Sequence, residues 1–281
     1  MKKLLIIIFI ILQIEDLSGQ QDFSFVFLPD THLQPDSMIE AKFKKVASVI
    51  KDHNPDFVIT GGDMIYTARN LDEKQSETLF DFMDGKLREL EVPIHYVVGN
   101  HECVGIRAES GMAISNPYFG KQMFELRYGS RFKSFTNSGW KFFLLDGIEI
   151  LENERNYTTG VDPLQIEWIK NELIGINRHT PIVIVIHSPL INPLAVKSSG
   201  EKLLSENAET VLNLFKEYNL RVVLQGHNHV YMNLFFEGVY YISGGSTLYR
   251  EIQDPYNDGF IYMKISDNLE KIEFVHTDLE N

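Results

Sequence analysis

The sequence has a single cysteine, Cys103, among its 281 residues, so no internal disulfide can form. Basic residues are also few, because 26 Lys and Arg stand against 39 Asp and Glu and give a formal net charge of −13. This surplus of negative charge disfavours binding to nucleic acid polymers or to anionic membranes. Low-complexity segments and repeats with a period of about 20 to 50 residues are missing as well. The fold must therefore be stabilised by packing and by bound metal.

The apolar run near the N-terminus is too short to cross a bilayer, which takes about 20 residues. Residues 4–12 follow two lysines and precede the small residues Ser18 and Gly19, which is the pattern of a secretory signal peptide. We therefore predict that residues 1–19 are a signal peptide and that the protein is exported to the periplasm or secreted. An uncleaved N-terminal membrane anchor is the alternative interpretation, and no stable insertion of the folded part is expected.

Residues 20–281 are predicted to form a single domain, because no Pro-, Gly- or Ser-rich linker divides them and 44% of the whole chain is hydrophobic. β-branched apolar runs predict strands, and apolar residues at helical spacing predict helices between them. The predicted strands are 23–28, 55–60, 93–98, 131–136, 140–145, 181–186, 220–224, 231–236, 239–242, 260–265 and 272–275. The predicted helices are 37–53, 79–90, 119–126, 164–174 and 203–218, with Ser37 as the candidate N-cap of the first.

Strands that alternate with helices indicate parallel pairing in the first part of the chain. The turn signal Asn137-Ser138-Gly139 then predicts a hairpin, with which a second sheet begins. Ligand sites in such sheets lie beyond the carboxyl ends of the strands.

Potential metal ligands follow five of the predicted strands. In chain order they stand as Asp30-Thr31-His32, Gly61-Gly62-Asp63, Gly99-Asn100-His101-Glu102, His187 and Gly226-His227-Asn228-His229. Each motif alone has a plain interpretation, such as a turn that closes a strand or a pair of surface histidines. Their recurrence at successive strand ends favours one shared metal site.

The candidate ligands are carboxylates, an amide oxygen and imidazoles, without a thiolate: Asp30, His32, Asp63, Asn100, His187, His227 and His229. This set is too large for one tetrahedral zinc and suits two ions of Zn, Fe or Mn that share a carboxylate. Such a pair deprotonates a bridging water near neutral pH and clamps phosphoryl oxygens for in-line displacement. His101 would then donate a proton to the leaving group or stabilise the charged transition state.

In their order along the chain, these five motifs resemble the signature of the calcineurin-like metallophosphoesterases, D-x-H, G-D, G-N-H-[DE], a strand-end His and G-H-x-H. The resemblance implies a four-layer αββα sandwich of two mixed β-sheets flanked by helices, with a dimetal site at the C-terminal edge of the strands. It implies a first ion held by Asp30, His32, Asp63 and His229, and a second held by Asp63, Asn100, His187 and His227. Asp63 would bridge the ions, and His101 would be the catalytic histidine.

The activity implied by this resemblance is metal-dependent hydrolysis of small-molecule phosphate mono- or diesters. A non-catalytic binding protein on the same fold, or a purple-acid-phosphatase-type iron enzyme, is the alternative. Asp30-Thr31-His32-Leu33 followed by Gly99-Asn100-His101-Glu102 resembles the branch with bacterial cyclic-nucleotide phosphodiesterases. In contrast, Gly62-Asp63-Met64-Ile65-Tyr66 resembles purple acid phosphatases, in which Tyr binds ferric iron. That branch has Gly where His32 stands, so Tyr66 is expected to be a wall residue.

Some residues keep two interpretations. Glu102 either supports a ligand or begins a helix, and the segment 243–246 either lets substrate approach closely or forms a tight turn. Cys103 is expected to be a small buried residue. The candidate phosphate-contacting arginines are Arg107, Arg155 and Arg250, and the loops expected to set specificity are 105–118, 149–159 and 192–200. Neither the substrate nor the oligomeric state follows from the sequence.

Overall fold

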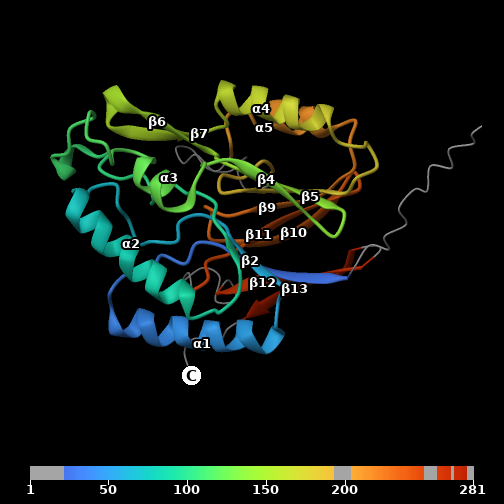
Figure 1. The fold of residues 1–281 in the computed structure, drawn as a ribbon, viewed down its shortest axis with the longest axis horizontal. Helices are drawn as coiled ribbons and strands as arrows, with labels where there is room; N and C mark the ends of the chain where they lie inside the picture. The colour runs from blue at the N-terminus through green and yellow to red at the C-terminus, as the bar shows by residue number, and fades with distance from the viewer. Residues whose placement is uncertain (1–21, 193–203, 250–257, 267–268, 277–281) are drawn as a thin grey trace, which may run out of the picture.

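The computed structural model describes residues 22–192, 204–249, 258–266 and 269–276, so the predicted signal peptide lies outside the described residues. Two β-sheets pack face to face, and helices cover the outer face of each (Figure 1). The main elements are β1 (Phe23–Leu28), α1 (Ser37–His53), β2 (Phe57–Thr60), α2 (Glu73–Arg88), β3 (Ile94–His95), α3 (Gln122–Tyr128), β4 (Lys133–Asn137), β5 (Trp140–Leu145), β6 (Ile148–Leu151), β7 (Asn156–Thr159), α4 (Pro163–Ile174), β8 (Ile182–Ile186), α5 (Ala208–Phe215), β9 (Leu220–Gln225), β10 (Tyr231–Phe236), β11 (Val239–Gly244), β12 (Gly259–Ile265) and β13 (Leu269–His276).

Both large sheets are mixed, as the resemblance implied. The first has the strand order β13-β12-β1-β2-β3, with β1, β2 and β3 parallel and β12 and β13 antiparallel to their neighbours. The second has the order β10-β11-β9-β8-β5-β4, with a parallel centre and an antiparallel strand at each edge. The hairpin β6–β7 forms a separate small sheet.

The side chains of a strand point alternately to the two faces of its sheet, so each sheet packs against the other sheet on one face and against helices on the other. Phe23, Phe25 and Phe27 of β1 point into the core between the two sheets, because side chains of a strand alternate between its faces. The Phe25 ring stacks on Phe57 at a centroid distance of 5.2 Å and meets Phe142 of the opposite sheet edge-on at 5.5 Å. Aromatic packing of this kind joins the two sheets.

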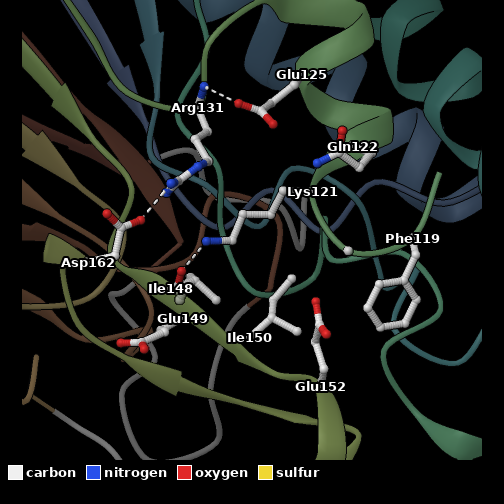
Figure 2. Close-up of a pocket in the computed structure, with 11 residues that line it drawn as sticks. Phe119, Lys121, Gln122, Glu125, Arg131, Ile148, Glu149, Ile150, Glu152 and Asp162 are labelled. Atoms are coloured by element: carbon white, nitrogen blue, oxygen red, sulfur yellow. Dashed lines mark hydrogen bonds and ion pairs between the residues drawn. The ribbon is translucent and has the colours of Figure 1, made fainter. Parts of the chain in front are cut away.

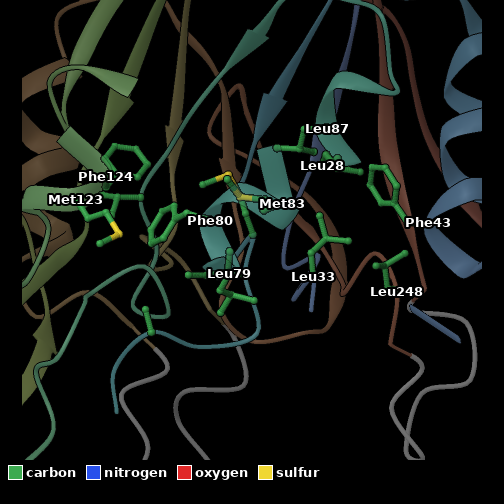
Figure 3. Close-up of a cluster of buried hydrophobic side chains, with 14 of the residues drawn as sticks. Leu28, Leu33, Phe43, Leu79, Phe80, Met83, Leu87, Met123, Phe124 and Leu248 are labelled. Atoms are coloured by element: carbon green, nitrogen blue, oxygen red, sulfur yellow. The ribbon is translucent and has the colours of Figure 1, made fainter. Parts of the chain in front are cut away.

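Two further cores lie on the outer faces of the sheets. Phe43 of α1 and Phe80 and Met83 of α2 pack over the first sheet (Figure 3). Ile169 of α4 and Phe215 of α5 pack over the second. The order helix, sheet, sheet, helix confirms the predicted αββα sandwich.

Two predicted element boundaries are wrong, because polar side chains accept hydrogen bonds from the backbone N–H groups there. Asp36, and not Ser37, caps α1, because its carboxylate accepts from the backbone N–H groups of Met38 and Ile39 at 2.9 and 3.1 Å. The predicted strand 93–98 is reduced to Ile94–His95, and the N–H of Val97 donates to the Thr60 hydroxyl instead of continuing the ladder.

The segment 149–159 was expected to be a loop but contributes to the hairpin β6–β7. The hairpin predicted at residues 137–139 is confirmed, and Ser138 and Gly139 both have positive φ angles, 44° and 79°. α5 begins at Ala208, later than predicted. No helix of the described part of the chain is long and apolar enough to cross a membrane.

Candidate metal centre

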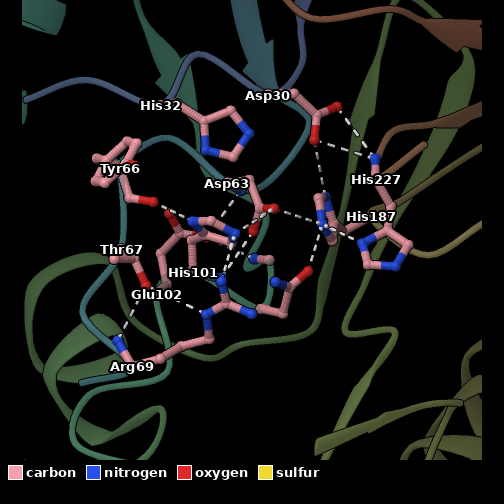
Figure 4. A network of polar contacts seen from close by, with 12 residues as sticks. Asp30, His32, Asp63, Tyr66, Thr67, Arg69, His101, Glu102, His187 and His227 are labelled. Atoms are coloured by element: carbon pink, nitrogen blue, oxygen red, sulfur yellow. Dashed lines mark hydrogen bonds and ion pairs between the residues drawn. The ribbon is translucent and has the colours of Figure 1, made fainter. Parts of the chain in front are cut away.

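The predicted ligands come together where the tips of β1, β2, β8 and β9 meet (Figure 4). Asp30 and Asp63 follow strands of the first sheet, whereas His187 and His227 follow strands of the second. Both carboxylates and His187 are at most 2% exposed. The site therefore lies at the seam between the sheets, at the carboxyl ends of their strands, as predicted.

One group of ligand atoms belongs to Asp30, His32 and His229. Each residue offers one atom, and these atoms lie within 4.8 Å of one another. The Nε2 atoms of His32 and His229 are 2.9 Å apart, and the His229 Nε2 lies 3.6 Å from Asp30 Oδ1. This is the set predicted for the first ion, apart from Asp63.

A second group contains Asp63, His187 and His227, with Asn100 beside it. The His187 Nε2 lies 3.2 Å from Asp63 Oδ2, 3.1 Å from Asn100 Oδ1 and 3.2 Å from His227 Nδ1. Asp63 also shares a ligand group with His32 and His101. Its carboxylate thus lies within reach of one histidine of each predicted ion site, His32 and His187, and the bridging role that the resemblance implied for Asp63 stays a prediction.

The donor chemistry of this second group fits a cation. His187 donates its Nδ1–H to the carbonyl oxygen of Gly61 at 2.8 Å, so in the neutral ring, the form that binds metal, Nε2 is an acceptor. That lone pair faces the oxygens of Asn100 and Asp63, which are acceptors too. Burial lowers the pKa of His187, but the Asp63 carboxylate outweighs this effect and raises the pKa to about 10. The cluster therefore favours a positive charge at this point, which a metal ion or a proton can supply.

Burial also prepares two other imidazoles for metal binding. It lowers the pKa of His32 and of His227 to about 3, so both rings are neutral and keep a lone pair at neutral pH. Burial would raise the pKa of Asp63, but His101 and His187 hold that pKa well below its usual range. The ionised carboxylate of Asp63 together with the neutral imidazoles of His32 and His227 suits Zn, Fe or Mn.

The backbone holds these residues in a strained conformation. Positive φ angles occur at five predicted ligands: Asp30 (46°), His32 (46°), Asp63 (50°), His227 (73°) and His229 (51°). Each such residue costs about 1 to 3 kcal/mol, and such strain persists only where the surroundings enforce it. Here Asp30 donates its N–H to the Gly62 carbonyl at 3.1 Å, and the His227 N–H donates to the Asp30 carboxylate at 3.1 Å.

Two glycines of the ligand motifs lie so close to ligand carboxylates that no side chain would fit there. A Cβ on Gly226 would lie 2.6 Å from Asp30 Oδ2, and a Cβ on Gly99 would lie 2.3 Å from Asp63 Oδ1. Only glycine fits where backbone packs directly against a ligand carboxylate. Gly226 thus lets the tip of β9 pack against Asp30 of the opposite sheet, and Gly99 lets its loop pack against Asp63.

Glu102 supports the site and does not begin a helix. Its fully buried carboxylate accepts from four backbone N–H groups, those of Asp63, Met64, Ile65 and Gly99, at 2.7 to 3.2 Å. Burial and the neighbouring Asp63 raise the pKa of Glu102 to about 7, against the effect of these donors. Glu102 therefore ties together the tips that carry Asp63 and Asn100.

His101 lies at the open side of the cluster, with 18% of its side chain exposed. Its Nδ1 donates to the Tyr66 carbonyl, and its backbone N–H donates to Asp63 Oδ1 at 2.8 Å. The Nε2 lies 3.7 Å from Asp63 Oδ2 and 3.0 Å from Nη2 of Arg69 (Figure 4). The ring is fixed through Nδ1, which leaves Nε2 directed into the site. Arg69 belongs to no motif, so the sequence analysis missed it.

Other candidates have structural contacts. The Tyr66 side chain is 48% exposed, while His32 is buried at the ligand position. Ser246 donates its hydroxyl to the Asp30 carbonyl at 2.9 Å, so the segment 243–246 braces the tip of β1. Arg155 donates to backbone carbonyls, among them those of Gly105 and Met112 at 2.9 Å. Arg250 and most of the loop 192–200 lie outside the described residues.

A cavity of about 210 Å³ lies between α3 and the β6–β7 hairpin (Figure 2). Its cations are already paired: Lys121 with Asp146 at 2.5 Å, and Arg131 with Asp146 and Asp162 at 2.6 Å each. The cations that line the cavity therefore belong to a structural ion network.

Comparisons with known proteins agree with this geometry. The family model described as calcineurin-like phosphoesterase matches residues 23–231. A protein of Psychrobacter arcticus named probable cyclic nucleotide phosphodiesterase is 25% identical over 230 residues, which are 80% of this chain and 74% of that protein.

Solved structures show the same fold at low sequence identity. A dimetal phosphatase from Danio rerio matches with a TM-score of 0.65 and 13% identity, over 91% of this chain and 99% of that one. GAP50, the anchor in the inner membrane complex of Plasmodium, matches with a TM-score of 0.58 and 15% identity, over 92% and 85% of the two chains. Because the family model covers most of the chain, the protein belongs to the calcineurin-like phosphoesterase family and is a metal-dependent phosphoester hydrolase.

Proposed function

We propose that the protein is an exported phosphoesterase that hydrolyses phosphate mono- or diesters of small molecules at a dinuclear metal centre. One observation carries this proposal: the buried Nε2 of His187 lies within 3.2 Å of both Asn100 Oδ1 and Asp63 Oδ2, so three potential ligand atoms converge on one point. Buried acceptors that face one another are stable only around a positive charge. Asp63 belongs to two of the three groups of potential ligand atoms, one with His187 and His227 and one with His32 and His101, which supports two ions rather than one.

Asp30, His32, Asp63 and His229 would hold the first ion, and Asp63, Asn100, His187 and His227 the second. The donor set suits Mn, Fe or Zn. When bound, the ions would supply an activated water and positive charge for the phosphoryl oxygens. Proton transfer to the leaving group would then be the task of a side chain of the protein.

His101 is the residue we assign to the leaving group. Its Nδ1–H is held by the Tyr66 carbonyl, so Nε2 is the atom that meets the substrate. That atom can hold a proton for the leaving oxygen or a hydrogen bond to the charged transition state. The 18% exposure of the side chain gives a substrate access to it.

The substrate is proposed to be a small molecule rather than a nucleic acid polymer, since the net charge of −13 opposes polyanions. Cyclic nucleotides are candidate diesters because the relative from Psychrobacter arcticus is named a probable cyclic nucleotide phosphodiesterase. Export is proposed from the signal-peptide pattern of residues 1–19 alone. For Tyr66 we keep the role of a wall residue, and a purple colour after iron loading would contradict it.

The test is an activity screen of the protein loaded with Mn, Zn or Fe, with the metal content measured in parallel. The panel contains phosphomonoesters, cyclic nucleotides, phospholipid head-group esters and pyrophosphates. Cleavage of at least one ester class is expected. Full metal loading without cleavage of any compound would instead support the non-catalytic binding protein, and cleavage of carboxylic esters alone would remove phosphate from the proposal.

The role of His101 is tested by His101→Ala, with the exposed His179→Ala as a matched control. We expect His101→Ala to keep its metal and to lose turnover by about 10²- to 10⁴-fold, the range typical of a lost general acid. His179→Ala should behave as the wild type. Unchanged turnover in His101→Ala would disprove the role.

A further inference from the structure

A cation outside the predicted ligand set points into the site. Arg69 lies in the loop after β2, and its Nη2 is 3.0 Å from Nε2 of His101 (Figure 4). Its Nε donates to the Thr67 hydroxyl at 3.2 Å, and its guanidinium carbon lies 5.9 Å from the centre of the Tyr157 ring. The guanidinium is thus held on two sides and directed at the atom assigned to the leaving group.

The charge of Arg69 has no acidic partner within the described residues. Its contacts are a hydroxyl, an imidazole and an aromatic ring, and no carboxylate described here lies within 4.0 Å of it. Arg131 and Arg127 differ, because each pairs with two aspartates at 2.6 to 2.9 Å. A guanidinium that faces a phosphoester site without a counter-ion is suited to bind an anion there.

The loop that carries Arg69 is held rigidly against the loop that carries His101. The Ala68 N–H donates to the His101 carbonyl at 2.8 Å, and the Arg107 N–H donates to the Arg69 carbonyl at 2.8 Å. The Gly105 N–H donates to the Ala68 carbonyl at 3.0 Å. Such preorganisation lowers the entropy lost when an anion binds.

Among the other arginines considered, none fits this role better. Arg155 donates to backbone carbonyls, and no polar contact of the Arg107 side chain with a predicted site residue is present in the described structure. Arg69 is therefore distinguished by its position next to His101 and by the absence of a carboxylate partner among the described residues.

We propose that Arg69 binds a terminal phosphoryl oxygen of the substrate and thereby favours phosphomonoesters over diesters. This inference depends on the proposed function of the same site. A monoester has three terminal oxygens and a charge near −2, whereas a diester has two terminal oxygens and a charge of −1. The two ions would already bind phosphoryl oxygens. A monoester still has a further terminal oxygen and a further negative charge for an arginine to bind, whereas a diester does not.

The first experiment compares Arg69→Gln with Arg178→Gln, which removes the same charge from a surface ion pair with Glu217. The probes are inorganic phosphate, 4-nitrophenyl phosphate and bis(4-nitrophenyl) phosphate. We expect Arg69→Gln to weaken phosphate binding to the metal-loaded protein by about 10- to 100-fold, the range for one lost charge-assisted hydrogen bond. The kcat/KM for the monoester should fall by a similar factor and that for the diester by less than about 3-fold. Arg69→Lys should have a phosphate affinity and a monoester kcat/KM between those of the wild type and Arg69→Gln. Lys keeps the positive charge but lacks the two-pronged guanidinium.

A second comparison separates substrate binding from positioning of His101. The double variant His101→Ala/Arg69→Gln is compared with His101→Ala alone. If Arg69 binds phosphate, the double variant should bind phosphate more weakly than His101→Ala. If Arg69 only orients His101, the two variants should bind phosphate equally well. The metal content should stay equal in all variants.

These measurements also separate this inference from the proposed function. If the metal-loaded wild type cleaves none of the substrates, the proposed function is overturned. The role of Arg69 can still be tested in that case, because calorimetry measures phosphate binding without turnover. Equal phosphate affinity and equal monoester-to-diester ratios in Arg69→Gln and Arg178→Gln would overturn the role of Arg69. A metal-loaded wild type that binds no phosphate would overturn it as well.

Discussion

The Glu102 carboxylate accepts a hydrogen bond of 2.9 Å from the backbone N–H of Asp63, the residue predicted to bridge the two ions. The same carboxylate accepts from Gly99 at 2.7 Å, one residue before Asn100. A single buried acid thus fixes the strand tips that present two predicted ligands. Support of this kind orients ligands and affects metal affinity without touching the metal.

Glu102→Gln should therefore weaken both the fold and the metal site. The amide can replace only part of the acceptor capacity, so one or more buried N–H groups lose a partner, at a cost of about 1.5 to 3 kcal/mol in the free energy of unfolding. Metal affinity should fall by about 10- to 100-fold. Urea unfolding and metal titration test both effects, with the exposed Glu109→Gln as control. If the two variants behave alike, Glu102 is not a support of the site.

His227→Ala and His229→Ala should release different ions. His229 lies with Asp30 and His32, whereas His227 lies with Asp63 and His187. We expect His227→Ala to lose the second ion and to keep the first, and His229→Ala to show the reverse. Metal content after dialysis and two-step calorimetric titration measure this. Equal loss of both ions from each variant would indicate one indivisible cluster, while His179→Ala controls for loss of a histidine.

Two glycines should respond oppositely to alanine. In Gly226→Ala the new Cβ would meet Asp30 Oδ2 at 2.6 Å, so the ligand must shift and the variant should lose about 1 to 3 kcal/mol of stability together with metal affinity. Gly85 in α2 has nothing within 4 Å of an added Cβ, so Gly85→Ala should gain about 0.5 to 1 kcal/mol. Thermal unfolding with and without metal compares them. Tolerance of alanine at position 226 would show that the close approach is not required.

The sequence predicted the buried parts of the fold well. Strands such as β8 (Ile182–Ile186) are apolar throughout, and the pattern of β1 reflects a strand with distinct faces. Four of the five ligand motifs were found because they follow strands that the structure contains, whereas Gly99-Asn100-His101-Glu102 follows a predicted strand that is reduced to Ile94–His95. Errors occur where polar side chains decide the local structure: Asp36 caps α1 in place of Ser37, and the polar segment 149–159 pairs as a hairpin.

Two residues of the site show what a single sequence cannot provide. Glu102 was noticed because it adjoins a motif, but its four backbone partners come from two separate strand tips and are visible only in three dimensions. Arg69 adjoins no motif, and its distance of 3.0 Å from His101 joins residues 32 positions apart. Contacts between loops follow from the packing of the whole fold, not from local patterns.

Because the candidate centre lies at the seam between the sheets, a bound ion would act as a removable cross-link between them. His32 and His229 are 197 residues apart in the chain, yet their Nε2 atoms lie 2.9 Å from each other. An ion held there joins distant segments, as a disulfide does in other proteins, in a chain whose single cysteine cannot form one. Unlike a disulfide, such a link would withstand reducing agents and yield to chelators. The metal supply of the surroundings would thus add to the cohesion that the aromatic core gives the two halves of the sandwich.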